Sequence, residues 1–97
     1  MLTSQDLAAL EKATANKLQV VINYTKKTTG EAVTHVCGIY EIGYNKAGEP
    51  CVWGWDVNSN DNIRQFLISN IDSIQILDVP FYPPHPWPIK INGQIIG

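Results

Sequence analysis

The sequence is poor in charged side chains, and neither sign of charge dominates any part of it. Charged residues make up 16% of the 97 residues, and the formal net charge is −2. Up to Glu49 the chain carries five basic and five acidic residues, and after it two basic and four acidic residues. A domain that binds a phosphate backbone usually has a basic excess, so this composition argues against a nucleic-acid partner.

The sequence also lacks a long apolar run. Polar residues 3–6 follow directly on Leu2, so no signal-peptide pattern is present there, and no stretch reaches the length that spans a bilayer. We therefore expect one domain located in the cytoplasm, with no membrane partner.

Residue types that carry enzyme or metal chemistry are sparse. The two cysteines, Cys37 and Cys51, and the two histidines, His35 and His85, show none of the short paired spacings of zinc sites. No nucleophile with a neighbouring base and no pair of carboxylates is evident, so we expect no catalytic residue, no cofactor and no bound metal. Both cysteines are expected to be reduced and packed in a sheet.

The apolar pattern predicts one helix followed by short strands. Thr3 is a favourable N-cap for a helix that ends near Asn16. Residues 18–25 are rich in β-branched side chains and alternate between apolar and polar, which predicts a first strand. Residues 32–42 form the second strand, and residues 45–48 form the turn into the third.

The turn at 45–48 sets a register for the strands on its two sides. If opposed residue numbers sum to 93, Tyr40 lies opposite Trp53. The same register places Gly38 opposite Trp55, where the glycine would make room for the large ring.

A second polar turn, at 58–62, leads into a fourth strand at 63–68. On the register that follows, Asp56 lies directly opposite Arg64. A single helical turn at 69–72 and a short fifth strand at 73–77 complete the pattern. The sequence therefore predicts a mainly β fold, a small SH3-like or Sm-like five-stranded barrel with an N-terminal α-helix and a proline-rich C-terminal extension.

The composition changes after Asp78. Five of the six prolines lie within residues 80–88, which predicts an extended tail. Asn92-Gly93 between two apolar stubs predicts a type I′ hairpin. We accordingly divide the chain into residues 1–78, the helix and barrel, and residues 79–97, the tail with its terminal hairpin.

Several segments of the chain follow a known order of features. They are Ile22-Asn23-Tyr24, Gly30-Glu31, the hairpin up to Gly48, Trp53-Gly54-Trp55-Asp56, Arg64-Gln65-Phe66 and Asn70-Ile71-Asp72-Ser73-Ile74. In this order the chain resembles the WYL domain, an Sm-like β-barrel of bacterial and phage proteins. The resemblance covers roughly three-fifths of the chain.

The resemblance implies a stand-alone regulatory module that senses a small, nucleotide-like ligand without catalysing a reaction. Two features depart from the family. The name-giving Trp-Tyr-Leu triplet falls on Pro50-Cys51-Val52, and two arginine positions of the family hold Leu67 and Asn70. The loss of two cationic positions argues against a ligand rich in phosphate.

Six side chains are the candidate ligand contacts. Arg64 leads because a guanidinium on a strand can hold a phosphate or carboxylate with two hydrogen bonds. Its structural alternative is an ion pair with Asp56. The other candidates, aromatic rings that could stack on a base and one lysine of a polar turn, also have structural alternatives in core packing and solvation: Tyr24, Lys26, Tyr40, Trp53 and Trp55.

The proline-aromatic tail supports a second hypothesis, a protein-interaction or oligomerisation module. Extended segments of this kind dock in aromatic grooves or wrap a neighbouring subunit. The interface residues would be Phe81, Tyr82 and Trp87, and we expect a homo-oligomer. The alternative is that the tail packs on its own barrel.

Overall fold

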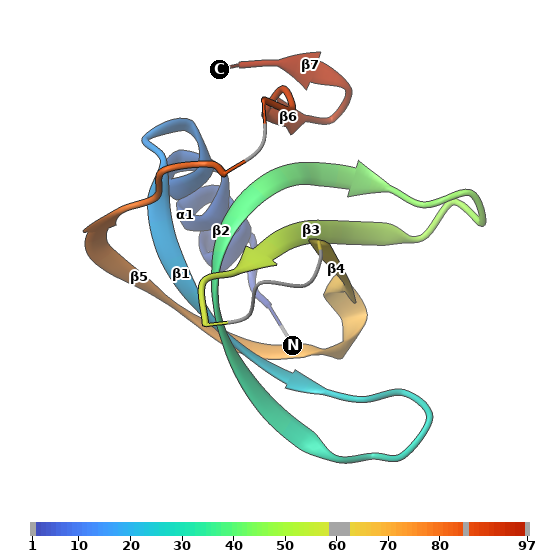
Figure 1. The fold of residues 1–97 in the computed structure, drawn as a ribbon. Helices are drawn as coiled ribbons and strands as arrows, with labels where there is room; N and C mark the ends of the chain where they lie inside the picture. The colour runs from blue at the N-terminus through green and yellow to red at the C-terminus, as the bar shows by residue number, and fades with distance from the viewer. Residues whose placement is uncertain (1, 59–62, 85, 97) are drawn as a thin grey trace.

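The computed structural model describes residues 2–58, 63–84 and 86–96, which form one helix followed by a bent sheet (Figure 1). Most of the turn predicted at 58–62 lies outside the described residues, as does His85. In chain order the elements are α1 (Ser4–Ala15), β1 (Leu18–Thr25), β2 (Ala32–Tyr44), β3 (Pro50–Asp56), β4 (Ile63–Leu67), the 3₁₀ turn η1 (Ile68–Asn70), β5 (Ile71–Pro80), β6 (Lys90–Ile91) and β7 (Gln94–Ile95).

The helix α1 begins at the predicted cap. The Thr3 hydroxyl accepts a hydrogen bond from the Asp6 N–H (3.1 Å), and the Asp6 carboxylate accepts one from the Thr3 N–H (2.9 Å). These two bonds satisfy N–H groups that a first helical turn leaves unpaired. Leu10 and Ala13 are buried in the main core. No helix of the described residues is long and apolar enough to cross a membrane.

The main sheet has the strand order β4-β3-β2-β1-β5, with antiparallel neighbours throughout. It curves around its own core, and α1 packs against β1, β2 and β5 (Figure 1). Within the described residues β4 and β5 do not pair with each other, so hydrogen bonds do not close the sheet. The mainly β fold with an N-terminal helix is confirmed, whereas the barrel type is not.

Side chains that alternate along the strands give the sheet two faces. The inner face, toward α1, carries the main core: Val20, Ile22, Cys37, Ile39, Ile42, Val52, Phe66 and Ile71. The opposite face, here called the outer face, carries a second cluster of Tyr40, Phe81 and Ile89, against which Trp55 and Ile63 pack.

The predicted register of β2 and β3 is right at one end and wrong by one residue at the other. Gly38 lies opposite Trp55 as predicted, but Trp53 faces Glu41 and not Tyr40. A bulge between residues 39 and 41 shifts the pairing, because one extra residue of β2 is accommodated at Tyr40. Tyr40 lies on the outer face with Gly38, and the bulge changes the face of the residues beyond it, so that Ile42 belongs to the main core.

The turn between these strands explains the error. The Asn45 N–H donates to the Glu49 carbonyl (2.9 Å), which leaves three residues in the loop. Gly48 has a φ of +80°, the left-handed conformation that closes three-residue hairpin loops. Tyr44 consequently faces Pro50, one position beyond the predicted pairing.

The predicted register of β3 and β4 is also wrong, by two residues. Arg64 faces Gly54, and not Asp56. A shift of two residues keeps every side chain on its predicted face, because the side-chain period of a strand is two. Arg64 and Asp56 therefore still share the inner face, as diagonal neighbours.

The strand β5 is longer than the predicted segment 73–77, and the helical turn before it starts one residue earlier than predicted. In the described sheet β5 pairs with β1 alone, so it is an edge strand. An edge strand tolerates a terminal proline such as Pro80, which has no N–H to donate. β5 passes through residue 78, and the division of the chain there stays a prediction.

After β5 the chain returns across the outer face (Figure 1). The Phe81 N–H donates to the Lys17 carbonyl (2.7 Å), and its ring covers Gly38 so closely that an added Cβ would lie 2.1 Å from the ring. Gly38 lies opposite Trp55 as predicted, and the side chain nearest to it is the Phe81 ring, for which it makes room. Farther on, β6 pairs in parallel with β2, and Asn92 (φ 52°) and Gly93 (φ 84°) form the predicted type I′ hairpin.

Candidate functional site

A group of polar and aromatic side chains lies where the apolar rows of the inner face end. His35 precedes buried Cys37 by two positions on β2, and Arg64 precedes buried Phe66 by two positions on β4. Tyr24 follows buried Ile22 in the same way on β1. Because alternate residues of a strand share a face, these rows carry the polar residues onto the rim of the inner face. We call this group the rim cluster, and its members are Tyr24, His35, Asp56, Arg64 and Phe66.

Asp56 is the centre of the rim cluster. Its Oδ2 lies 2.8 Å from the His35 Nδ1 and 3.6 Å from the Arg64 Nε. Its Oδ1 accepts a hydrogen bond from the Asn58 N–H (2.9 Å). Both carboxylate oxygens are thus engaged, and the side chain is only 9% exposed.

These contacts keep Asp56 ionised. Burial acts to raise the pKa of its carboxyl group, but the hydrogen bonds with His35 and the Asn58 N–H, and then the charges of His35 and Arg64, outweigh burial and hold the pKa below 3.8. An ionised carboxylate can only accept hydrogen bonds, so the Nδ1 of His35 carries the proton that they share.

Cys37 lies close to Asp56 but cannot act as a thiolate there. Its side chain is completely buried, and burial followed by the negative charge of Asp56 raises the pKa of its thiol to about 12. A nucleophilic cysteine needs a lowered pKa and access to solvent. Cys51 is also buried, and both cysteines are free. No group of three or more potential metal ligands occurs within the described ranges.

The aromatic side of the rim cluster is a chain of ring contacts. Phe66 packs edge-on against Tyr24, with centroids 5.1 Å apart and planes at 75°, and its ring centroid lies 5.5 Å from that of His35. Phe66 is buried, whereas Tyr24 and His35 are partly exposed. The cluster thus presents an aromatic and an imidazole edge beside the Arg64 guanidinium.

Arg64 is held loosely. Its side chain is 46% exposed, and its contact of 3.6 Å with Asp56 is longer than the 2.7–2.9 Å that is typical of a charge-assisted hydrogen bond. The Asp56 oxygen that it approaches is already bound at 2.8 Å by His35. A guanidinium has five N–H donors in a fixed plane, and the described residues engage it only through this contact with Asp56, so they leave most of its bonding capacity for water or an anion.

The structure places two of the six candidate ligand residues, Tyr24 and Arg64, in the rim cluster. Lys26 lies in the turn after β1, where its Nζ forms an ion pair with Glu31 (3.3 Å) on the exposed surface. Its candidate role stays a prediction.

The other three candidates lie on the outer face, which the sheet separates from the rim cluster. Tyr40 and Trp55 belong to the second hydrophobic cluster, and half-buried Trp53 faces Glu41 across the strands. The tryptophans are thus neither in the main core nor beside Arg64, so the six residues do not form one site.

The predicted interface residues differ in exposure. Phe81 is 4% exposed and is packed against Gly38 and Tyr40 of its own chain. Tyr82 is 81% exposed and Trp87 is 48% exposed, although the Trp87 ring also contacts Tyr40.

Sequence reasoning missed His35 and Phe66 as members of the site. The spacing of His35 from His85 argues only against a metal or catalytic site. The predicted register already placed Cys37 opposite Asp56, and His35 is two residues from Cys37 on the same face. A diagonal neighbour two positions away is within side-chain reach, and this signal could have found the His35–Asp56 pair.

Comparisons with known proteins bear on the fold alone. No protein-family model matches the chain, and no curated protein matches it. Among solved structures, the chain is similar to the proteasome accessory factor B/C (PafBC) of Arthrobacter aurescens, with a TM-score of 0.73 and 21% sequence identity over 87% of this chain. This likeness supports a WYL-like fold. The chain corresponds to only 13% of the length of that protein.

Proposed function

We propose that the chain is a non-enzymatic regulatory module that binds a small anionic ligand, such as a nucleotide, at the rim cluster. The observation that carries the proposal is the loose, half-exposed guanidinium of Arg64 beside a carboxylate that other groups already satisfy. An anion can replace the weak contact with Asp56 at little cost, and it gains a two-point contact with Arg64.

The aromatic and imidazole rings of the rim cluster favour a ligand with a flat group, such as a base. Tyr24 and His35 both contact the Phe66 ring, and His35 shares the Asp56 carboxylate with Arg64, so a base could pack on these rings while its anionic group meets Arg64. One guanidinium suits a single phosphate or carboxylate better than a triphosphate.

Two further observations favour a binding role over a catalytic one. The thiol nearest to the His35–Asp56 pair is buried and neutral, so this pair has no activated cysteine to serve. The WYL-like fold is shared with PafBC, a WYL-domain-containing regulator, and a regulatory role in the cytoplasm fits such a module.

A thermal-shift screen tests the proposal. A ligand at 100 times its Kd stabilises a protein by about 2.7 kcal/mol, which for a domain of this size raises Tm by roughly 11–22 °C. The panel contains nucleoside monophosphates, nucleoside triphosphates, cyclic nucleotides and inorganic phosphate.

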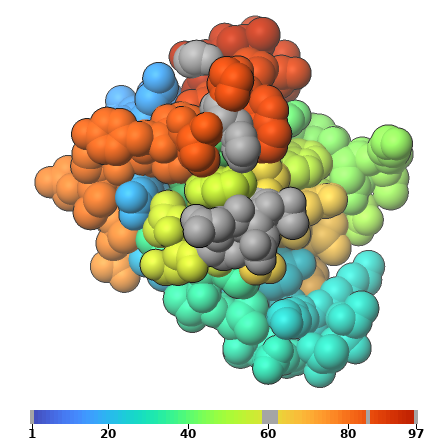
Figure 2. Space-filling view, in the orientation of Figure 1, coloured from blue at the N-terminus to red at the C-terminus, as the bar shows by residue number. Residues whose placement is uncertain are grey.

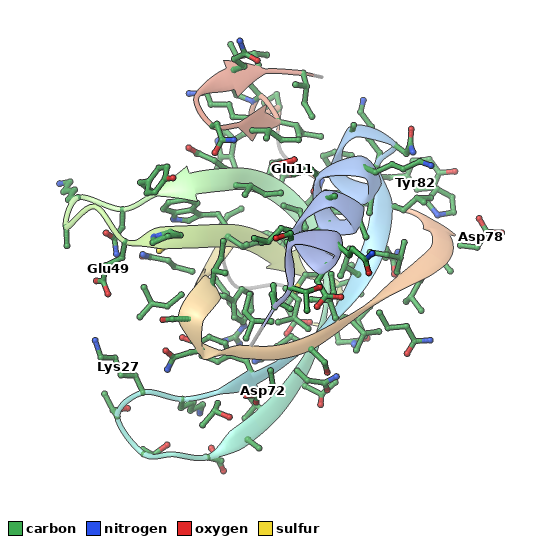
Figure 3. All side chains as sticks on the ribbon, turned by 180° about the vertical axis from the view of Figure 1, so that it is seen from behind. Glu11, Lys27, Glu49, Asp72, Asp78 and Tyr82 are labelled. Carbon is green, nitrogen blue, oxygen red and sulfur yellow. The ribbon has the colours of Figure 1, made fainter. Side chains whose placement is uncertain are left out.

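Arg64→Gln is the test variant, and Lys27→Gln is its matched control. Lys27 is an exposed residue of the turn between β1 and β2 and is not a member of the rim cluster, and its substitution removes the same charge (Figure 3). We expect the shift to disappear in Arg64→Gln and to persist in Lys27→Gln. A panel without any shift, or a shift that Arg64→Gln leaves unchanged, would contradict the proposal.

A further inference from the structure

The outer face carries an aromatic groove of about 220 Å³ that the proposed ligand site does not use. The strands β2, β3 and β4 form one wall, and the returning tail forms the other. In Figure 2 the tail, in orange, adjoins β3, in yellow, on this face. The groove is lined by Tyr40, Glu41, Trp53, Ile63, Trp87, Pro88 and Lys90.

The contacts at Tyr40 show which kind of segment this face accommodates. The Tyr40 ring packs edge-on against Phe81, at 5.6 Å and 89°, and against Trp87, at 5.4 Å and 64°. Both partners belong to the proline-aromatic tail. The outer face thus already binds one extended proline-aromatic segment, and the groove continues the same aromatic surface beyond it toward Trp53. Grooves of this composition bind extended proline-containing segments.

The middle of this same tail is presented to solvent. The residues Tyr82, Pro83 and Pro84 have no helical or strand structure, and Tyr82 is 81% exposed. Figure 3 shows Tyr82 at the periphery of the molecule. Two consecutive prolines restrict the backbone before any contact forms, so the ordering of this segment on binding costs little entropy.

We propose that two copies of the chain dock reciprocally, with the segment Tyr82–Pro84 of each copy lying in the outer-face groove of the other. A two-fold arrangement uses both contacts at once, because each copy supplies one groove and one segment. The segment is uncharged, so it meets no like charge at Glu41 or Lys90, the two charged residues of the groove.

The proposed contact is small, and the dimer is correspondingly weak. Three residues in a groove on each side bury less than the roughly 1,200 Å² of standard interfaces, and such contacts are typical of transient complexes. We expect a monomer–dimer equilibrium with a Kd between about 1 µM and 1 mM.

Sedimentation equilibrium over this concentration range tests the proposal with three variants. Tyr82→Ser changes a side chain that is almost fully exposed, so the fold is kept. Trp53→Ala opens the groove, and circular dichroism checks its folding. Val79→Ser is the control, because Val79 is 45% exposed on the edge strand β5 and does not line the groove. We expect Kd to rise at least tenfold in the two test variants and to stay unchanged in the control.

Mixing the two test variants gives a sharper result. A mixed dimer has one intact contact, between the groove of Tyr82→Ser and the segment of Trp53→Ala, whereas neither variant alone has any. We expect an equimolar mixture to associate more strongly than either variant by itself. A monomer throughout the range, or a dimer that Tyr82→Ser does not weaken, would overturn the proposal and would leave the ligand site at Arg64 untouched.

Discussion

The packing of Phe81 over Gly38 gives the most specific stability prediction. A Cβ added at Gly38 would lie 2.1 Å from the ring, and ordinary contacts begin at 3.4 Å, so the ring has to move by about 1.3 Å. Overpacking of this kind costs about 1–3 kcal/mol. The cost has an upper limit of about 3–5 kcal/mol, the usual cost of removing a buried phenylalanine, because the ring can leave its site altogether.

Urea unfolding of Gly38→Ala measures this cost, and we expect a loss of about 2 kcal/mol, which corresponds to a Tm lower by roughly 8–16 °C. Gly43→Ala is the matched control. It lies on the same strand and face, but its added Cβ would meet its nearest neighbour, the Glu41 carboxylate, at 3.5 Å, an ordinary contact. Its unfolding free energy should change by less than about 0.5 kcal/mol.

A double-mutant cycle isolates the cause. In the Phe81→Ala background the ring is gone, so Gly38→Ala should cost nothing, and it could gain about 0.5–1 kcal/mol because alanine is favoured over glycine within a strand. An equal cost of Gly38→Ala in both backgrounds would refute the assignment of this glycine to the Phe81 ring.

Three further predictions concern titration, thiol access and capping. The pKa of Asp56 is lowered in the folded state, so its contribution to stability is present above about pH 4 and is lost as the pH falls below its ordinary value. Urea unfolding between pH 6 and 3 should therefore show a weaker loss of stability in Asp56→Asn than in the wild type, and equal slopes would contradict this assignment. A thiol reagent at pH 8 should find no reactive cysteine in the native chain and two after unfolding, since Cys37 and Cys51 are buried and the pKa of Cys37 is raised to about 12. Rapid labelling of the native chain would show that the core around Cys37 is open. Thr3→Ala should lower the free energy of unfolding by about 0.5–2 kcal/mol through the lost cap, and an unchanged midpoint would show that the capping box contributes nothing.

Local signals predicted the parts of the fold that depend on neighbouring residues. The cap at Thr3 fixed the start of α1, and β-branched alternation fixed β1 at Leu18–Thr25. The Asn92-Gly93 dipeptide fixed the last hairpin, since both residues adopt positive φ. In each case the conformation is decided within a few residues of the signal.

The errors occur where the outcome depends on residues far apart in the chain. The bulge at Tyr40 returns the pairing to the predicted register at Gly38 and Trp55 after the turn has shifted it by one residue at Trp53, and no local feature of β2 signals this bulge. The role of Gly38 depends on Phe81, which is 43 residues away in the sequence and arrives only when the tail returns. The periodic pattern of apolar residues along a strand carries no information about such long-range packing.

Only part of the candidate site could be predicted, because its members come from strands that are far apart in the sequence. Alternation placed Arg64 and Asp56 on one face despite a register error of two residues, because an even shift preserves faces. The aromatic candidates share a residue type but not a face, because the sheet separates Tyr24 from Tyr40, Trp53 and Trp55. Residue type alone could not assign these rings to a face.

The most direct test of the proposed ligand site is a nitrogen–proton NMR titration with the best ligand of the nucleotide panel. The chain has one arginine and three tryptophans, so a single spectrum reports the Arg64 Nε–H of the rim cluster and the indole N–H groups of the outer face. We predict that the Arg64 Nε–H signal shifts in a saturable manner, while the Trp53 indole signal does not move. An Arg64 signal that stays in place while an indole signal titrates would contradict the account and would move the site to the outer face.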